Sequence, residues 1–483
     1  MTEAGRTLLP WAHHSGAYAL PTSILVRLKL GETPASIPAG LDVLRGKTAP
    51  ASTTGHHVLD RVVRTFGGGI QVSRLHAAAA SLRNVGQRNR GYSDDEELAG
   101  ISRVLRFDVE PGTHIGSLAI SLRQLDIVES AIPNYLCTVG LDGPPAPESR
   151  QPDPDGWAPR DMIGARQAMA HEPGDRAVIV GIVDSGLKSD HQEFNASALR
   201  HGYDTVQLGK GELAGGIELL GDNSGPDTNP TDNYVGHGTG CAGIIGATGL
   251  AMPAGLAGAC SLLPIRSLGA ARFPGRKTAT GVGSIGDLDI GTVMAVQLGA
   301  KVINMSFGTD DEALEPNATK PHAEAVAFAT QRGVTLVAAS GNSGDERVYW
   351  PAAFPEVIAV GSVALDGSVS EFTTSGGHVA LCAPGERIRT AGLEGYQNAT
   401  GTSFAAPFTA ATAALLISRA QRRSASLDPA TIKQLLTASA TPHRGDIKTG
   451  HGTGVLNAAR ALALLDQALD EDVSTEIEGV DDG

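Results

Sequence analysis

Cysteine, aromatic side chains and long apolar runs are all scarce in this sequence, and each shortage excludes a class of protein. The four cysteines among its 483 residues form no C-x-x-C pair, so neither a zinc ribbon nor a thioredoxin-type redox motif is expected. No apolar stretch reaches the ~18 residues that a membrane-spanning helix needs, and we expect no membrane span. Aromatic residues make up 4% of the chain while glycines number 61, a balance that predicts tightly packed helices and many turns.

Basic residues are also outnumbered. Lys and Arg total 38 against 52 Asp and Glu, which gives a formal net charge of −14. Nucleic acid is therefore not expected as a partner, because phosphate contacts need clustered Lys and Arg. Residues 1–21 lack the basic segment followed by an apolar one that marks a secretory signal. We therefore expect a cytoplasmic protein with reduced thiols, with secretion through another start site or export route as the alternative.

A proline-rich stretch divides the chain into two segments. Residues 140–157 hold five prolines among Asp, Glu and Gly, a composition typical of an extended, exposed linker. We expect a small domain over residues 1–139, this linker over 140–157, a large domain over 158–466 and an acidic tail over 467–483. The last 18 residues, from Asp466 to Gly483, contain eight acidic side chains and no basic one.

The segment before the linker is expected to form a small α+β domain of the ferredoxin-like type, with the order βαββαβ. The expected strands span residues 23–30, 70–75, 101–109 and 127–136, and the expected helices span 57–66 and 115–125. The stretch between the second and third strands, including Asp94 to Glu97, is expected to be a long loop. Nothing in this segment looks catalytic.

The segment after the linker alternates β-branched runs with helical stretches. This alternation predicts an α/β fold, a doubly wound parallel sheet with flanking helices. The expected strands span residues 177–183, 262–267, 301–305, 335–339 and 357–360, and the clearest helices span 290–298 and 323–331. Ligands of such folds lie beyond the carboxyl ends of the strands, so residues just after the strands are the place to look for chemistry.

Four polar residues stand among glycines and alanines at the ends of these elements. They are Asp184 after the first strand, His237 in Gly-His-Gly-Thr-Gly, Asn342 after a later strand and Ser403 in Gly-Thr-Ser-Phe-Ala-Ala-Pro. A serine hydroxyl needs a base to accept its proton and a third group to orient that base. The oxyanion that forms on the attacked carbonyl needs fixed donors, such as an amide or a helix N-terminus. These four residue types together predict nucleophilic attack by serine.

On these motifs the larger segment resembles the subtilases, the subtilisin-like serine proteases, over about residues 157–465. The chain order in that family is Asp, His, Ser, as in Asp184, His237 and Ser403. The resemblance implies a serine endopeptidase in which Ser403 attacks, His237 is the base and Asp184 orients it. It also implies that Asn342 and the Ser403 backbone N–H form the oxyanion hole.

The same resemblance implies where a protein or peptide substrate binds. Extended substrate is expected to pair with Ser306, Phe307 and Gly308, with a second strand of contacts near Gly269.

Two further substrate-binding residues are expected nearby, Gly341 and Tyr349. Tyr349 falls near the floor of the pocket for the P1 side chain, the residue before the scissile bond, although packing alone would also explain a tyrosine here. No acidic residue stands at or beside Tyr349, so an apolar P1 residue is expected.

Residues 128–134 (VESAIPN) are similar to the stretch that ends the inhibitory propeptides of this family. The similarity implies that the protein's own N-terminal domain assists folding, blocks the active site and is then removed. Residues near Asn134 to Cys137 would occupy the site, and self-cleavage is expected between Cys137 and Arg160.

Several assignments have alternatives. Gly450 to Gly454 repeats the histidine motif around His451, but only His237 lies between Asp184 and Ser403. Cys241, four residues after His237, resembles the thiol of the subgroup that includes proteinase K, and is either a buried small residue or a regulatory thiol.

The loop over residues 222–233 holds six Asp and Asn side chains, which could bind calcium. It lacks EF-hand spacing, so a plain polar loop is the other interpretation, and we assign no metal site and no cofactor. At this point two other functions stay open: a catalytically silent binding scaffold, or a maturation protease dedicated to one peptide partner.

Overall fold

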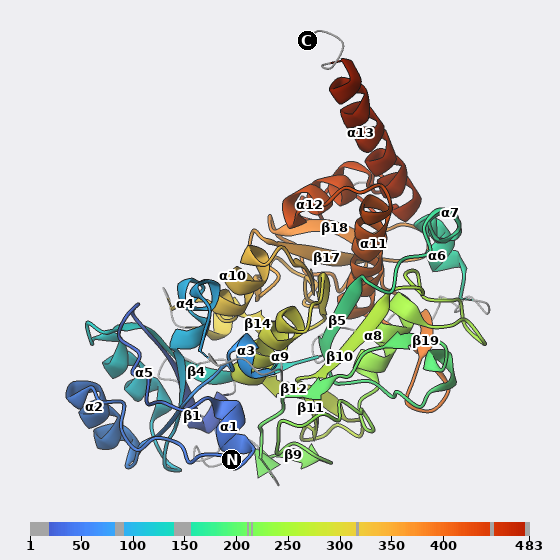
Figure 1. Ribbon diagram of the computed structural model, residues 1–483. Coiled ribbons are helices and arrows are strands. Elements are labelled where there is room, and N and C mark those ends of the chain that lie inside the picture. Colours follow the sequence, from blue (N-terminus) through green and yellow to red (C-terminus); the bar gives the residue numbers. More distant parts are fainter. Residues whose placement is uncertain are drawn as a thin grey trace.

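The computed structural model describes residues 19–82, 91–139, 156–209, 212–213, 216–314, 318–444 and 449–478. Figure 1 shows a small N-terminal unit, in blue and cyan, lying beside a larger unit built around a second sheet. Of the helices in these ranges, none has the length and apolar character to cross a membrane. The predicted linker lies outside the described residues except for residues 156 and 157.

The N-terminal unit is an antiparallel sheet covered by two helices. Its main elements are β1 (Ala19–Leu28), α2 (His57–Gly67), β2 (Gln71–Arg74), β3 (Val104–Asp108), α5 (Ile115–Arg123) and β4 (Val128–Thr138). The strands pair in the order β2-β3-β1-β4, so the predicted βαββαβ arrangement is confirmed. Leu59 and Val63, four residues apart on α2, are fully buried against the sheet.

Short helices fill the connections of this unit, and one of them corrects the sequence prediction. They are α1 (Gly40–Leu44), α3 (Ala79–Leu82) and α4 (Asp94–Leu98). The Asp94 to Glu97 segment, expected as loop, forms α4 because Ser93 and Glu96 make a reciprocal capping box at its start. Residues 101–103, expected as strand, form a 3₁₀ turn before β3.

The larger unit contains the predicted doubly wound parallel sheet. Its strand order is β18-β17-β15-β13-β5-β10-β6, with β7 also paired to β10. The bounds are β5 (Ile179–Asp184), β6 (Ala198–Leu199), β7 (Tyr203–Asp204), β10 (Ser261–Arg266), β13 (Val302–Met305), β15 (Thr335–Ala339), β17 (Val357–Val363) and β18 (Val379–Pro384). All neighbouring pairs are parallel, and β10, β13, β15, β17 and β18 are buried at every residue.

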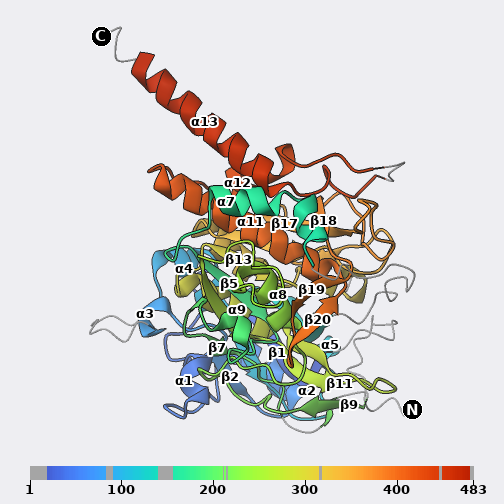
Figure 2. The ribbon, with the colours of Figure 1, turned by 90° about the vertical axis from the view of Figure 1, so that its right-hand side faces the viewer.

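Helices cover both faces of this sheet. They are α6 (Ala158–Met162), α7 (Ala165–His171), α8 (His237–Gly246), α9 (Ile285–Gln297), α10 (Ala323–Gln331), α11 (Thr402–Arg422), α12 (Pro429–Ala438) and α13 (Ala458–Glu478). One core cluster joins α8 and α11 to the sheet, and another joins α9 and α10. Helix α13 runs on through much of the predicted acidic tail, and its far end extends away from the body of the molecule (Figure 2).

The N-terminal sheet continues into the larger unit, and the two parts together form one eight-stranded sheet. Four strands of the larger unit, β8 (Glu212–Leu213), β9 (Ile217–Leu220), β11 (Gly269–Arg272) and β12 (Thr280–Ser284), extend the N-terminal sheet in the order β4-β12-β11-β9-β8. The junction is the antiparallel pair β4 and β12. Two small antiparallel pairs complete the fold: β14 (Thr309–Asp310) with β16 (Tyr349–Trp350), and β19 (Ile388–Ala391) with β20 (Tyr396–Ala399).

Candidate active site

Asp184 and His237 meet at the carboxyl end of β5. Asp184 is the last residue of that strand and is fully buried, and its Oδ1 lies 2.8 Å from Nδ1 of His237. His237 is the first residue of α8 and follows Gly236, whose φ of 76° is the left-handed conformation that glycine adopts freely. The pair therefore has the geometry in which a carboxylate fixes the orientation of an imidazole.

A glycine allows α8 to come this close to β5. A Cβ atom at Gly238 would lie 2.3 Å from the Gly186 carbonyl oxygen and 3.1 Å from Cβ of Asp184. Any other residue would push the helix, and His237 with it, away from the strand.

Ser403 enters the same site from the N-terminal end of α11. It is the second residue of that helix and is 5% exposed. Its Oγ donates to the Ser306 carbonyl at 3.4 Å, whereas Nε2 of His237 is buried without a hydrogen-bond partner among the described residues. The ring of Phe404 lies 5.0 Å from the imidazole, centroid to centroid. The serine hydroxyl and the imidazole thus share a site, but the hydroxyl is turned to Ser306.

Asn342 follows β15 and is held by the residue before Ser403. Its Oδ1 accepts hydrogen bonds from both the backbone N–H and the hydroxyl of Thr402, each at 2.9 Å. A Cβ atom at Gly401 would lie 3.5 Å from Nδ2 of Asn342. The amide nitrogen therefore faces the start of α11 and is free to donate to an oxyanion beside Ser403.

The end of β4 lies between β12 and the segment that follows β13. Residues Leu136, Cys137 and Thr138 pair with Ser284, Gly283 and Val282 of β12. On its other side Thr138 forms an antiparallel bridge with Gly308, and the Val139 N–H donates to the Gly281 carbonyl at 3.1 Å. An extended segment of the protein's own chain thus lies against Gly308, one of the residues predicted to pair with substrate. The strand opposite is β12, whereas the sequence predicted contacts near Gly269, which begins the adjacent β11.

Tyr349 packs beside Gly308, in the segment that follows β13. It lies on β16, where its backbone pairs with Asp310, and its ring lies next to both Gly308 and Gly341. The other predicted contacts, Ser306 and Phe307, are buried. The ring of Phe307 makes an edge contact with His322 at 5.6 Å.

Cys241 lies directly behind the site. Its Sγ approaches the Ser403 carbonyl at 3.4 Å, and the ligand atoms of Asp184, His237 and Cys241 all lie within 4.8 Å of one another. Burial and the nearby Asp184 carboxylate raise the pKa of the Cys241 thiol well above its usual value, so the thiol is neutral near pH 7. This environment favours the buried small residue over the reactive thiol.

His451 lies elsewhere. Its backbone carbonyl accepts from the Cys382 thiol of β18 at 3.4 Å and from the His443 ring at 3.0 Å. Since β18 is an edge strand of the sheet that has β5 near its centre, the second Gly-His-Gly-Thr-Gly copy is not at the site.

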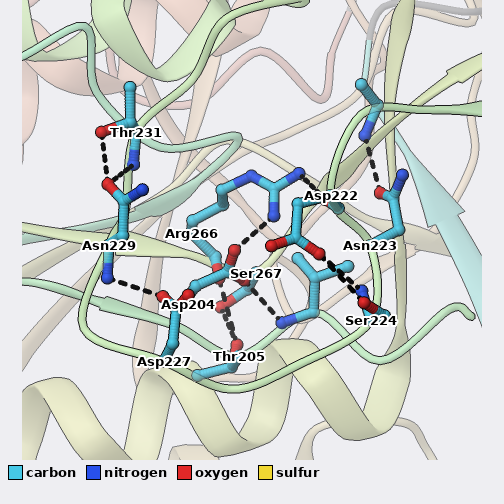
Figure 3. A network of polar contacts seen from close by, with 12 residues as sticks. Asp204, Thr205, Asp222, Asn223, Ser224, Asp227, Asn229, Thr231, Arg266 and Ser267 are labelled. Carbon is cyan, nitrogen blue, oxygen red and sulfur yellow. Dashed lines mark hydrogen bonds and ion pairs between the residues drawn. The ribbon is translucent and has the colours of Figure 1, made fainter.

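The oxygens of the Asp- and Asn-rich loop largely bind donors of the chain itself (Figure 3). Asp222 accepts from Ser224, Asp227 from the Asn229 N–H at 2.6 Å, and Asn223 from the Ala270 N–H at 3.1 Å. The guanidinium of Arg266 stands in the middle, paired with Asp204 and donating to the Asp222 carbonyl at 2.6 Å. The positive charge beside this loop, for which calcium was one interpretation of the sequence, is therefore supplied by Arg266.

Sequence reasoning missed Asp232 and Ser185 as parts of the site. Asp232 is buried, and its carboxylate accepts the backbone N–H groups of residues 234, 235 and 236 at 2.7–2.9 Å. Ser185 donates to Asp232 at 2.7 Å and accepts the Gly238 N–H at 3.0 Å. Both residues thereby fix the start of α8. The sequence signal that could have found Asp232 was its position two to four residues before the N–H groups it accepts, the spacing of an Asx turn.

Comparisons with known proteins agree with this arrangement. Residues 175–463 match the sequence profile of the Subtilase family (Peptidase S8). The chain is 32% identical to the "Major intracellular serine protease" of Bacillus subtilis (strain 168) over 265 residues, 53% of this chain and 73% of that protein. It is 34% identical to "Thermitase" of Thermoactinomyces vulgaris over 312 residues, 62% of this chain and 93% of that protein.

Solved structures give the same picture. The structure of the prenylagaramide maturation protease PagA matches with a TM-score of 0.50 at 27% identity, covering 62% of this chain and 98% of that one. A protease structure from Pseudoalteromonas arctica PAMC 21717 matches with a TM-score of 0.54 at 24% identity, covering 64% and 97%, which shows a shared fold.

Proposed function

The chain belongs to the subtilase family of subtilisin-like serine endopeptidases, and from that premise we propose that Ser403, His237 and Asp184 are its catalytic triad. The observation that carries the proposal is the meeting of all three with Asn342 at the carboxyl edge of one sheet. The 2.8 Å contact between Asp184 and His237 supports it most directly. The complete set also argues against a silent binding scaffold.

The chemistry starts with a rotation of the Ser403 side chain. Its Oγ turns from the Ser306 carbonyl to Nε2 of His237, which accepts the proton as Oγ attacks the scissile carbonyl. Asp184 holds Nδ1 and stabilises the imidazolium that forms. The proton then passes to the leaving amine as the peptide C–N bond breaks, which leaves Ser403 acylated. A water molecule then gives a proton to His237 and attacks the ester, and Ser403 is released with its proton restored.

The oxyanion is stabilised by Nδ2 of Asn342 and the Ser403 N–H at the start of α11. Thr402 fixes the Asn342 side chain before the charge develops, so no reorganisation is needed during the reaction. Loss of one such donor typically costs ~10²–10³ in kcat.

We further propose that the protein is made as a zymogen and that its own N-terminal domain is the inhibitor. The end of β4 lies as an extra strand between β12 and Gly308, the position proposed for substrate backbone. Three polar contacts hold the two units together: the partly buried pair of Arg27 with Glu324 at 2.9 Å, and two buried contacts, Asn134 with the Gly286 N–H at 3.0 Å and Gln297 with the Ala77 carbonyl at 3.0 Å.

Two measurements test these proposals. A labelled fluorophosphonate, applied after limited proteolysis has removed residues 1–150, should label the wild type and not Ser403→Ala. Lack of labelling in the wild type would refute the catalytic assignment. Intact mass tests self-processing: the wild type should be cut between residues 137 and 160 while Ser403→Ala stays full length, and identical behaviour of the two would refute it.

A cytoplasmic location is proposed on the likeness to the intracellular Bacillus subtilis enzyme and on the cysteines. All four lie in described segments, are buried and form no disulfide, as suits a reducing compartment. Detection of the mature protein in culture medium rather than cell lysate would favour secretion instead. The likeness to PagA keeps a dedicated maturation protease as the second candidate, which substrate profiling distinguishes from general digestion.

A further inference from the structure

We infer that Tyr349 fills the space for the P1 side chain, so that this enzyme cleaves after glycine and alanine and excludes larger residues. The inference rests on the proposed function, because it takes Ser403 as the nucleophile. It narrows the apolar P1 residue expected from the sequence to its smallest members.

The strand register locates the residue that reacts. In an antiparallel pair, the residue two positions beyond the partner of Gly308 lies opposite Ser306. The Ser306 carbonyl is the group to which the Ser403 hydroxyl donates at 3.4 Å. A substrate that follows β4 and sets one residue opposite Gly308 therefore brings its residue opposite Ser306 to the nucleophile.

Two backbone segments flank that position, residues 306–308 on one side and Gly341 with Asn342 on the other. The ring of Tyr349 lies between them. A Cβ atom at Gly308 would lie 3.2 Å from Cβ and 3.5 Å from Cδ1 of Tyr349. One at Gly341 would lie 2.6 Å from Cδ2 and 2.7 Å from Cε2, the opposite edge of the ring. The ring thus spans the gap between the two glycines.

The neighbourhood of the ring has little room to give. Gly341 has a φ of 115°, where other residues are strained, and a Cβ there would also lie 2.6 Å from Oγ1 of Thr374. Only glycine at position 341 allows the backbone to approach the Tyr349 ring this closely. On this side the ring therefore contacts backbone, which cannot rotate away as a side chain could.

The backbone of Tyr349 is also fixed. It pairs with Asp310 across β14 and β16, and residues before and after it in the chain are anchored to the same segment. Trp350 donates to Asp311 at 2.7 Å, and Arg347 pairs with Asp310 at 3.0 Å. Because the ring is attached to a fixed backbone, a large P1 side chain would have to displace it against these contacts.

The chain's own sequence agrees with this selection. Thr138 is the residue opposite Gly308, and counting two residues on from Thr138 along the sequence gives Gly140. Glycine is the smallest residue, in line with the preference inferred for P1.

Quenched peptides of one sequence, varied only at P1 among Gly, Ala, Leu and Phe, test the inference on the processed enzyme. The wild type should cleave after Gly or Ala at least about 100-fold faster, in kcat/KM, than after Leu or Phe. Tyr349→Ala should raise kcat/KM for Leu and Phe relative to kcat/KM for Ala by about 100-fold. Tyr349→Phe, which keeps the ring, should retain the wild-type preference.

Fluorophosphonate labelling of Ser403 counts the active enzyme in each preparation, so a poorly folded variant is not mistaken for a selective one. Equal cleavage after Phe and Ala by labelled wild type, or an unchanged ratio in labelled Tyr349→Ala, would overturn the inference alone. Absence of labelling in the wild type would instead refute the proposed function.

Discussion

The Asp232 carboxylate accepts the backbone N–H of Gly236 at 2.7 Å, directly before His237 in the chain. It also accepts the N–H groups of residues 234 and 235, so one buried side chain shapes the entry into α8. We predict that Asp232→Asn lowers kcat by about 10- to 100-fold. The amide NH₂ cannot accept a backbone N–H, so the start of α8 shifts and the His237 imidazole moves with it. KM should change little, since Asp232 is not expected to touch substrate.

The matched control for this change is Asp227→Asn in the same loop. Asp227 is exposed, and its carboxylate accepts from the Asn229 N–H within the loop. Steady-state kinetics on active-site-titrated enzyme should show near wild-type values for this variant. A similar loss in both variants would mean that loop stability, and not the position of His237, is at stake.

Thr402→Val tests how Asn342, the proposed oxyanion donor, is oriented. The variant removes one of two hydrogen bonds to Oδ1 of Asn342 and keeps the size of the side chain. We expect kcat to fall about tenfold and Asn342→Ala to lower it by ~10²–10³, with small changes in KM. Thr402→Ser, which keeps the hydroxyl, should retain most of the activity, and a loss equal to that of Thr402→Val would contradict the role of the hydroxyl.

The ion pair between Arg27 and Glu324 is predicted to hold the inhibitory domain in place. Their side chains are 19% and 13% exposed, and burial raises the pKa of Glu324 even beside Arg27. In Glu324→Gln the Arg27 charge loses a partner in this poorly solvated contact, although Glu129 still pairs with it. Fluorophosphonate labelling of uncut full-length chain, resolved by mass, should therefore become about tenfold faster.

A second ion pair across the same boundary provides the comparison. Arg332 and Asp95 are 37% and 58% exposed and lie 3.3 Å apart, and exposed pairs contribute little. Arg332→Gln should leave the labelling rate within about twofold of wild type. If it accelerates labelling as much as Glu324→Gln, burial of the pair is not what matters.

Asp287 gives the stability of the folded chain a pH dependence. Burial raises its pKa from 3.8 to about 6, while the nearby Arg106 acts in the opposite direction. The folded state therefore keeps a proton that the unfolded state has lost between pH 4 and 6, and the free energy of unfolding falls as pH rises through this window. The loss is up to about 3 kcal/mol.

Urea unfolding of Ser403→Ala, a background without autolysis, measures this effect between pH 4 and 7. Asp287→Asn cannot ionise, so its stability relative to the background should rise with pH and level off above about pH 7. Parallel pH profiles for the two proteins would show that Asp287 does not titrate in this range.

The sequence patterns predicted those parts of the site that depend on local signals. β-branched runs located β5 and β15, and so placed Asp184 and Asn342 at strand ends. Glycine-rich surroundings then singled out His237 and Ser403 as candidates. The helix at Asp94 was also readable, since Ser93 and Glu96 have capping-box spacing, but the stretch was predicted as a loop.

The remaining parts depend on tertiary contacts that no local pattern reports. The segment Thr280–Ser284 reads TGVGS and has no strand-like run of apolar residues, yet it is β12 because β4 and β11 pair with it on either side. The partners of the Asp232 carboxylate could not be predicted either. From the sequence its oxygens could bind calcium or accept backbone N–H groups, and the choice depends on how the loop folds.

The shared sheet has a consequence for the proposed processed form, from which the N-terminal unit has been removed. With β4 removed, β12 becomes an edge strand, and Gly308 faces it with unpaired backbone groups. Such edges recruit any extended chain, including that of a neighbouring molecule, and are a known starting point for aggregation. We therefore expect the full-length protein to be the form that tolerates storage at high concentration, and the processed enzyme to be the one that needs substrate, or dilution, to remain dispersed.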